Sequence, residues 1–445
     1  MKSMLSEHAR EAYLRYAQVG KSVCLKITGA FVAFLWQLIT YRALGAAAGG
    51  LLAIFQSELR LAGTLAAIGL DREMTLVLPK APASGSDEQR RELIEGALII
   101  GITFGLIGAV IVATIVHFCD GYVVSPLLIT TGVLSFTLLV ILAGALRGLQ
   151  MPLVADIQFT IAPMLISSIG FSILIACKSA SIRNAASILV LGQVVVVSVA
   201  CLLLSKAARI ETNYRIFSVE PKKIGRLIRG VNLPLAICSS ASTLFPDLIL
   251  VTVGYLSSST SAAAFGVAVR YIRLARFVPV SFLHVKEPKL AALTNSDDGE
   301  HLKTEVRIAS IGSFLISLII LGILAVCSNW LMEIFGRDFA SLTPVFYIVI
   351  VAELVNSTAL MSPSVMLMNN RAFDMAIIYI TSYAAGLIFA VLASDRLGGV
   401  GAACGLLLAN LILAIWSAFA CRRETRVKAD VIPGMWFIGK LKRPE

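Results

Sequence analysis

Long apolar runs alternate with short polar segments along almost the whole of this 445-residue chain. Each run has about 20 residues or more, the length an α-helix needs to cross roughly 30 Å of hydrocarbon. Strands of a membrane barrel would alternate apolar and polar positions in segments of about ten residues, so the pattern excludes a barrel. It predicts an all-α polytopic membrane protein with about twelve transmembrane helices. The predicted spans are 22–44, 46–70, 93–118, 122–146, 155–177, 184–205, 230–254, 257–284, 306–328, 339–368, 373–394 and 398–421.

The longest polar segment, the basic linker 206–229, divides these spans into two six-helix bundles, 22–205 and 230–421. An amphipathic N-terminal segment, 1–21, precedes the first bundle, and a basic tail, 422–445, follows the second. A weak repeat supports the division, because "LGAAAGGLLAIF" opens the second span and "LSSSTSAAAFGV" opens the eighth. Since six is even, we expect the two bundles to share one topology about an axis along the membrane normal.

Composition and charge agree with a membrane protein. The chain is 58% hydrophobic and only 15% charged, whereas about a quarter of the residues in a typical soluble protein are charged. Twenty-eight Lys and Arg residues gather in the termini, the linker and the loops on the same side, against five in the loops on the other side. The positive-inside rule then makes both termini and the linker cytoplasmic. This bias accounts for most of the net charge of +11, so we expect no nucleic-acid partner.

Five basic residues remain inside the predicted spans, where each would cost about 2.5–3.5 kcal/mol at mid-bilayer. Three of them follow one another at i, i+3 and i+6 in "AVRYIRLARFVPV", within about a third of a helix circumference. Either they lie near the ends of the span and extend to the lipid headgroups, or they line a hydrated cavity for an anionic substrate. Arginine suits the second role, because its fork binds phosphate bidentately. The substrate-binding candidates are Arg270, Arg273, Arg276, Arg60 and Lys26.

Three carboxylates within the spans are candidates for ion coupling: Glu58, Asp247 and Glu353. Glu58 and Arg60 are two positions apart, so they do not share a helix face. Asp247 follows Pro246, where a freed backbone carbonyl and a carboxylate could together hold a cation. Each carboxylate could equally form a buried structural ion pair.

Glycine and proline positions predict close packing and helix breaks. Close packing of helices is expected at the GxxxG pairs Gly101/Gly105, Gly144/Gly148 and Gly401/Gly405. Prolines inside spans are tolerated where helices line a cavity or bend during transport. The prolines in question are Pro234, Pro246, Pro279, Pro344 and Pro363.

No motif for catalysis, metal binding or a cofactor occurs in the sequence. The eight cysteines form no CxxC pair, and there is no P-loop, zinc-protease motif or nucleophile elbow. "GGVGAACG" lacks the third glycine of a dinucleotide fingerprint and opens a membrane span. We therefore expect a protein that is not an enzyme and has neither a metal nor a cofactor.

Four stretches, in order along the chain, resemble the polysaccharide flippases of the multidrug/oligosaccharidyl-lipid/polysaccharide exporter superfamily. They are "LRGLQMPLVADIQFTIAPML", "VPVSFLHVKEPKLAALTNSDDGEHLKTEVR", "LMEIFGRDFASLTPVFYIVIVAELVNSTALMSPSVMLMNN" and "LGGVGAACGLLLAN". The resemblance implies two six-helix bundles around a central cavity, lined by the first, second, seventh and eighth helices. It also implies export of a polyprenyl-diphosphate-linked oligosaccharide by alternating access across a bacterial inner membrane, for exopolysaccharide, capsule or O-antigen synthesis. Arg270, Arg273 and Arg276 would then meet a diphosphate or acidic sugars.

The resemblance leaves partners and alternatives open. A polysaccharide polymerase or export machinery is a further candidate partner, and we expect a monomer. A cation-coupled multidrug exporter of the same superfamily is one alternative, although the first span offers only Lys26 where that branch commonly has a carboxylate. A membrane polymerase or ligase is another, although the chain lacks the large outside loop expected of one.

The charge bias predicts the topology. Reporter domains fused after Lys206 and at the C-terminus should both behave as cytoplasmic, because the basic segments stay on that side. Alkaline phosphatase and fluorescent-protein fusions measure this directly. A periplasmic signal at either position would contradict the predicted orientation.

Overall fold

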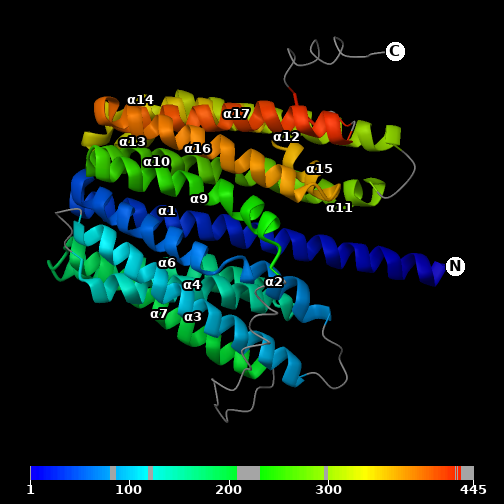
Figure 1. The fold of residues 1–445 in the computed structure, drawn as a ribbon, viewed down its shortest axis with the longest axis horizontal. Coiled ribbons are helices and arrows are strands. Elements are labelled where there is room, and N and C mark those ends of the chain that lie inside the picture. Colours follow the sequence, from blue (N-terminus) through cyan, green and yellow to red (C-terminus); the bar gives the residue numbers. More distant parts are fainter. Residues whose placement is uncertain are drawn as a thin grey trace. The chain divides into compact units, whose positions relative to one another are not determined.

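The computed structural model describes residues 2–80, 87–118, 124–207, 231–294, 299–425, 427 and 429–431. Every regular element among these residues is a helix, which confirms the predicted all-α class (Figure 1). Residues 2–21 are helical and continue without interruption into the first span.

The first half of the chain supplies nine of these elements. They are α1 (Lys2–Ala66), α2 (Leu70–Val77), the 3₁₀ turn η1 (Leu78–Lys80), α3 (Asp87–Phe118), α4 (Pro126–Gly148), α5 (Pro152–Asp156), the π-helical turn η2 (Ile157–Ile161), α6 (Ala162–Ala176) and α7 (Ile182–Ala207).

The second half supplies ten more. They are α9 (Leu233–Leu256), α10 (Ser259–Ala275), α11 (Phe277–Thr294), α12 (Gly299–Val326), α13 (Ser328–Glu333), η3 (Arg337–Leu342), α14 (Thr343–Ser357), α15 (Ser362–Met368), α16 (Ala372–Leu397) and α17 (Gly399–Thr425).

These helices account for all twelve predicted spans. Ten segments of the described chain are long and apolar enough to cross a membrane. One of them, Cys24–Ala66, has 43 residues, or about 65 Å of helix, which is enough for two crossings. Gly45 interrupts it with φ 79° and ψ 175°, at the predicted boundary between the first two spans. The eighth predicted span is the pair α10 and α11, which break at Arg276.

Contacts divide the chain into two compact units. The N-terminal unit contains Met1–Gly45 and Phe55–Ala236, and the C-terminal unit contains Ala46–Ile54 and Ile237–Glu445. The start of the second span therefore packs with the second half of the chain, against α9 and α10. A Cβ at Gly50 would collide with the carbonyl oxygen of Ser259. The repeated stretches that open the second and eighth spans are thus the ones that meet.

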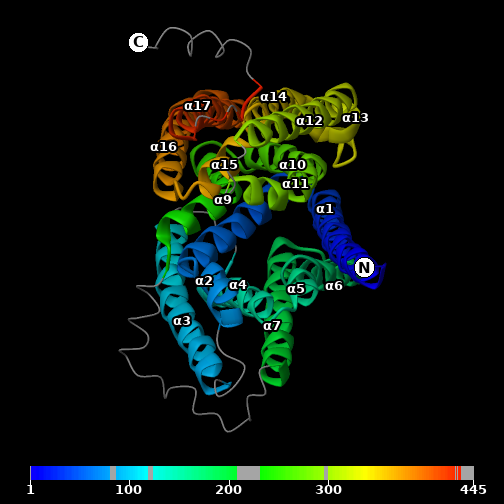
Figure 2. The ribbon, with the colours of Figure 1, turned by 90° about the vertical axis from the view of Figure 1, so that its right-hand side faces the viewer.

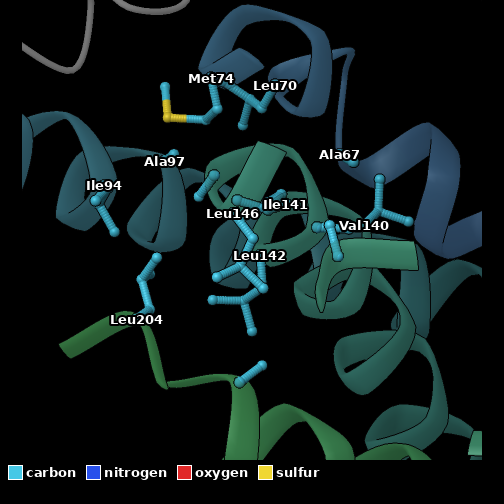
Figure 3. Close-up of a cluster of buried hydrophobic side chains, with 14 of the residues drawn as sticks. Ala67, Leu70, Met74, Ile94, Ala97, Val140, Ile141, Leu142, Leu146 and Leu204 are labelled. Atoms are coloured by element: carbon cyan, nitrogen blue, oxygen red, sulfur yellow. The ribbon is translucent and has the colours of Figure 1, made fainter. Parts of the chain in front are cut away.

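The N-terminal unit is built around α4, which packs against α2, α3 and α7. Leu70 and Met74 from α2 and Ile141, Leu142 and Leu146 from α4 are buried in one apolar cluster (Figure 3). The helix α2 is short and amphipathic. It begins where the predicted second span ends, and no helix was predicted there from the sequence.

The GxxxG predictions are confirmed. A Cβ on Gly101 would meet Ile141 of α4, and one on Gly144 would fall against the backbone of Asp71 in α2. In the C-terminal unit, a Cβ on Gly405 would lie 2.6 Å from the carbonyl oxygen of Gly386. Figure 2 shows α16 and α17 beside each other in that unit, in agreement with their packing contacts.

Four of the five prolines singled out in the sequence stand in the first turn of a helix, where a missing amide hydrogen costs nothing. They are Pro234, Pro279, Pro344 and Pro363. Only Pro246 lies inside a helix, α9.

The contact between α2 and α4 predicts a stability effect. Gly144→Ala should destabilise the protein by about 1–3 kcal/mol, the usual cost of overpacking, because the obstructing atoms are backbone. Gly322→Ala on α12 is the matched control, since its Cβ would meet nothing within 4 Å. Thermal unfolding of the purified variants in detergent measures both. Equal melting temperatures for the two would contradict the close approach.

Candidate functional site

The C-terminal unit brings together the arginines near the end of α10 and two of the three candidate carboxylates. The helix is buried around most of its circumference, and Phe265, Val267 and Tyr271 are almost inaccessible. Tyr271 fixes the helix in the unit, because its hydroxyl donates to the carbonyl of Leu331 at 2.7 Å and its ring packs against Phe346. The three arginines are only half-buried.

Arg273 clamps α10 to α9. Its Nη2 donates to Asp247 Oδ1 at 3.0 Å and to the carbonyl oxygen of Thr243 at 3.2 Å. Asp247 follows Pro246, whose missing amide and bulky ring disturb the hydrogen bonds of the preceding turn. The Asp247 carboxylate and a backbone carbonyl in the turn before this proline both accept from the guanidinium of Arg273, so Asp247 forms the ion pair that was the alternative to cation binding.

Arg276 makes a second clamp, from the break between α10 and α11 to α14. Its Nε lies 3.0 Å from Glu353 Oε1. Asn356, one turn further along α14, places Nδ2 3.4 Å from both oxygens of Glu353. Because Arg276 stands between α10 and α11, its ion pair with Glu353 connects α10, α11 and α14.

In both clamps the carboxylate is more deeply buried than the arginine. The Asp247 and Glu353 side chains are 2% and 9% exposed, whereas those of Arg273 and Arg276 are 24% and 30% exposed. An isolated buried carboxylate is costly, so each acid depends on its arginine. The side chain of each arginine is still partly exposed.

Aromatic side chains complete the surroundings of Arg276. Tyr379 and Tyr383 of α16 pack against each other, with ring centroids 5.6 Å apart. Tyr383 in turn stacks on Phe245 of α9, with ring centroids 4.1 Å apart and planes 5° apart. The stack fixes α16 against the helix that carries Asp247.

The remaining candidates lie elsewhere. Arg270 is half-buried one turn before Arg273. Lys26, Glu58 and Arg60 belong to the N-terminal unit, where Lys26 is exposed and Glu58 is buried. Arg60 Nη2 lies 3.4 Å from Ser57 Oγ in that unit. The structure thus joins Arg273 and Arg276 with Asp247 and Glu353, and it leaves the other candidates outside this cluster.

The cluster changes how the candidates are interpreted. Two residues proposed for substrate binding are the ion-pair partners of two residues proposed for ion coupling. Within the cluster the two arginines and the two carboxylates balance in charge, and Arg270 lies one turn before Arg273 on the same helix. Among the described residues, no group of three or more His, Cys, Asp or Glu side chains could hold a metal ion.

Sequence reasoning missed Asn356, Thr243 and Tyr383. The sequence does indicate that Asn356 lies near Glu353, because it follows Glu353 by three positions and therefore lies on the same helix face. Thr243 contributes only a backbone carbonyl, and Tyr383 arrives from a helix more than 100 positions away from Arg276, so neither had a local signal.

Comparisons with solved structures identify the fold. No protein-family model and no curated protein matches the chain. An inward-facing multidrug resistance MATE family transporter of the MOP superfamily is similar over 92% of this chain and 98% of its own, with TM-score 0.66 and 14% identity. The chain has the MATE transporter fold.

Two further structures with this fold are similar to the chain. A MOP superfamily transporter from Pyrococcus furiosus, described as having a binding pocket of reverse polarity that suggests a different function, covers 92% of this chain and 95% of its own. Its TM-score is 0.59 and its identity 14%. A variant of the Vibrio cholerae MATE transporter VcmN covers 92% and 97%, with TM-score 0.59 and 16% identity.

The second clamp predicts non-additive stability effects. Glu353→Met should cost about 3 kcal/mol, near the lower end for a broken buried pair, because Arg276 stays partly exposed. Arg276→Met combined with Glu353→Met should cost less than the single change, since no unpaired charge remains. Detergent unfolding of the purified variants measures both values.

Asp374→Asn is the matched control for this cycle. Asp374 pairs with Arg371 at 3.6 Å while both side chains are more than 40% exposed, so its loss should cost about 0–1 kcal/mol. Strictly additive costs for Arg276→Met and Glu353→Met would show that the pair contributes no coupling.

Proposed function

We propose that the protein is a transporter, not an enzyme, that moves an amphiphile with an anionic group, such as a polyprenyl-diphosphate-linked oligosaccharide, across a bacterial inner membrane. The observation that carries this proposal is the pair of partly exposed arginines, Arg273 and Arg276, each held by a buried carboxylate. A diphosphate offers the planar acceptor geometry that a guanidinium fork recognises.

The ion pairs also suggest how binding is coupled to protons. An anionic substrate competes with Asp247 or Glu353 for the same arginine. A buried carboxylate that loses its arginine is unfavourable as an anion, so it takes up a proton. Binding of the substrate and uptake of a proton are then one event, and release of the substrate restores the ion pair.

A multidrug exporter is the second candidate, and the fold comparisons favour it. Two of the solved structures with this fold are multidrug resistance transporters, although identities of 14% and 15% bear on the fold alone. In this function Asp247 and Glu353 would bind a coupling cation or a cationic drug after leaving their arginines. Glu58 in the N-terminal unit would be a third coupling carboxylate.

The two candidates predict opposite phenotypes in a strain that lacks the gene. For the flippase, undecaprenyl-linked intermediates accumulate on the cytoplasmic face of the membrane, and drug susceptibility is unchanged. For the multidrug exporter, drug susceptibility rises and the intermediates do not accumulate. Complementation with the wild-type gene should reverse whichever change occurs.

Arg273 provides the site-specific test. Arg273→Gln should weaken the interaction with an anionic substrate by about 1–3 kcal/mol, the scale of a hydrogen bond to a charged group. Arg273→Lys should restore export only in part, because lysine keeps the charge without the fork. The readout is the amount of accumulated intermediate at equal protein level, with Asp374→Asn as the control. Normal export by a variant with Arg270, Arg273 and Arg276 all changed to Gln would rule out the proposed binding role.

A further inference from the structure

The chain folds back on the C-terminal unit after α17 ends. Val427 and residues 429–431 lie over the end of the unit at which α17 terminates, and we call them the strap. Val427 and Ala429 are buried in the same apolar cluster as Val306 of α12 and Met361. The segment expected from its charge to be a basic tail therefore begins with residues that belong to the core of the unit.

Three hydrogen bonds fix the backbone of the strap. The Ser310 hydroxyl of α12 donates to the carbonyl of Ala429 at 3.2 Å, and the Ser362 hydroxyl at the start of α15 donates to the same carbonyl at 3.4 Å. The amide of Val431 donates to the carbonyl of Thr358 at 2.9 Å.

A buried ion pair closes the strap onto α17. Arg422 donates through Nε to Asp430 Oδ1 at 2.9 Å and through Nη2 to Oδ2. The Asp430 side chain is fully inaccessible, so both of its oxygens depend on this bidentate contact. Beneath the strap, Cys421 is completely buried, with Sγ 3.7 Å from the carbonyl of Val427.

The strap is hydrogen-bonded to both sides of the break between α14 and α15. The helix before this break, α14, carries Glu353 and Asn356 of the candidate site. Residues 358–361 separate α14 from α15, and the Thr358 carbonyl is one of the acceptors that the end of α14 leaves unsatisfied. Ser362 begins the next helix. Glu353 and Asn356 lie within the last turns of α14, so the position of the break sets where they meet Arg276.

We propose that the strap is a conformational latch, which holds the break between α14 and α15 in the geometry that keeps Glu353 on Arg276. Opening of the latch releases the end of α14 and allows that ion pair to separate. The latch acts on the protein itself, so it stands whichever class of substrate is carried.

Two cysteines of the chain report on the latch in the purified full-length protein. Asp430→Asn should raise the rate at which a maleimide labels Cys421 by at least tenfold, measured by peptide mass spectrometry. Cys238, which is buried in the same apolar cluster and donates to the carbonyl of Ala372, should stay protected. Labelling of both would mean that the unit has unfolded, and continued protection of Cys421 would overturn the latch.

A third position tests the link to the site without any transport assay. In an Asn356→Cys background, adding Asp430→Asn should raise labelling of position 356 at least threefold, whereas adding Asp374→Asn should not. Truncation after Thr425 should reproduce the effect, and truncation after Val431 should not. If Cys421 becomes reactive while position 356 does not, the strap only covers the end of the unit and the proposal fails.

Discussion

The structure depends on the cost of placing charge in an apolar medium. Hydrocarbon cannot solvate an arginine or a carboxylate, so each such side chain inside a span must find a partner within the protein or reach water. Arg273 and Arg276 meet this requirement with Asp247 and Glu353, at 3.0 Å in both cases. The same requirement fixes which helices of the C-terminal unit pack together, because the partners come from α9, α10 and α14.

Both ion pairs lie at irregular points of the backbone. Asp247 follows an internal proline, and Arg276 stands between α10 and α11. Irregular backbone leaves carbonyl groups free, and at membrane depth these are tolerated only where protein or water satisfies them. Arg273 donates to the carbonyl of Thr243 in the turn before Pro246, and the strap donates to the carbonyl of Thr358 at the end of α14. Helix breaks and charged side chains thus occur at the same positions. At such a position the C-terminal unit can change conformation by breaking only a few contacts.

A site made of paired charges has different chemistry from a simple cationic cavity. Its arginines are already bound, so an anion must compete with a carboxylate, and the acid released must be neutralised. In the proposed function, affinity is therefore lower than free arginines would give, while binding is linked to protonation. A transporter needs such a link, since a ligand bound equally well in every state would not be moved.

Most of the fold was predictable from the sequence, because length and apolar content alone decide whether a segment can cross a bilayer. The twelve spans, the interruption at residue 45 and the close approach at Gly144 all follow from local patterns. The sequence also identified every charged residue of the paired cluster, since charge within a span is conspicuous. It could not say that Arg273 belongs to Asp247 and Arg276 to Glu353, nor that residues after α17 return to the core. Those pairings join positions 26 and 77 residues apart, and a helical period specifies a face but not what lies opposite it, so only tertiary packing decides them.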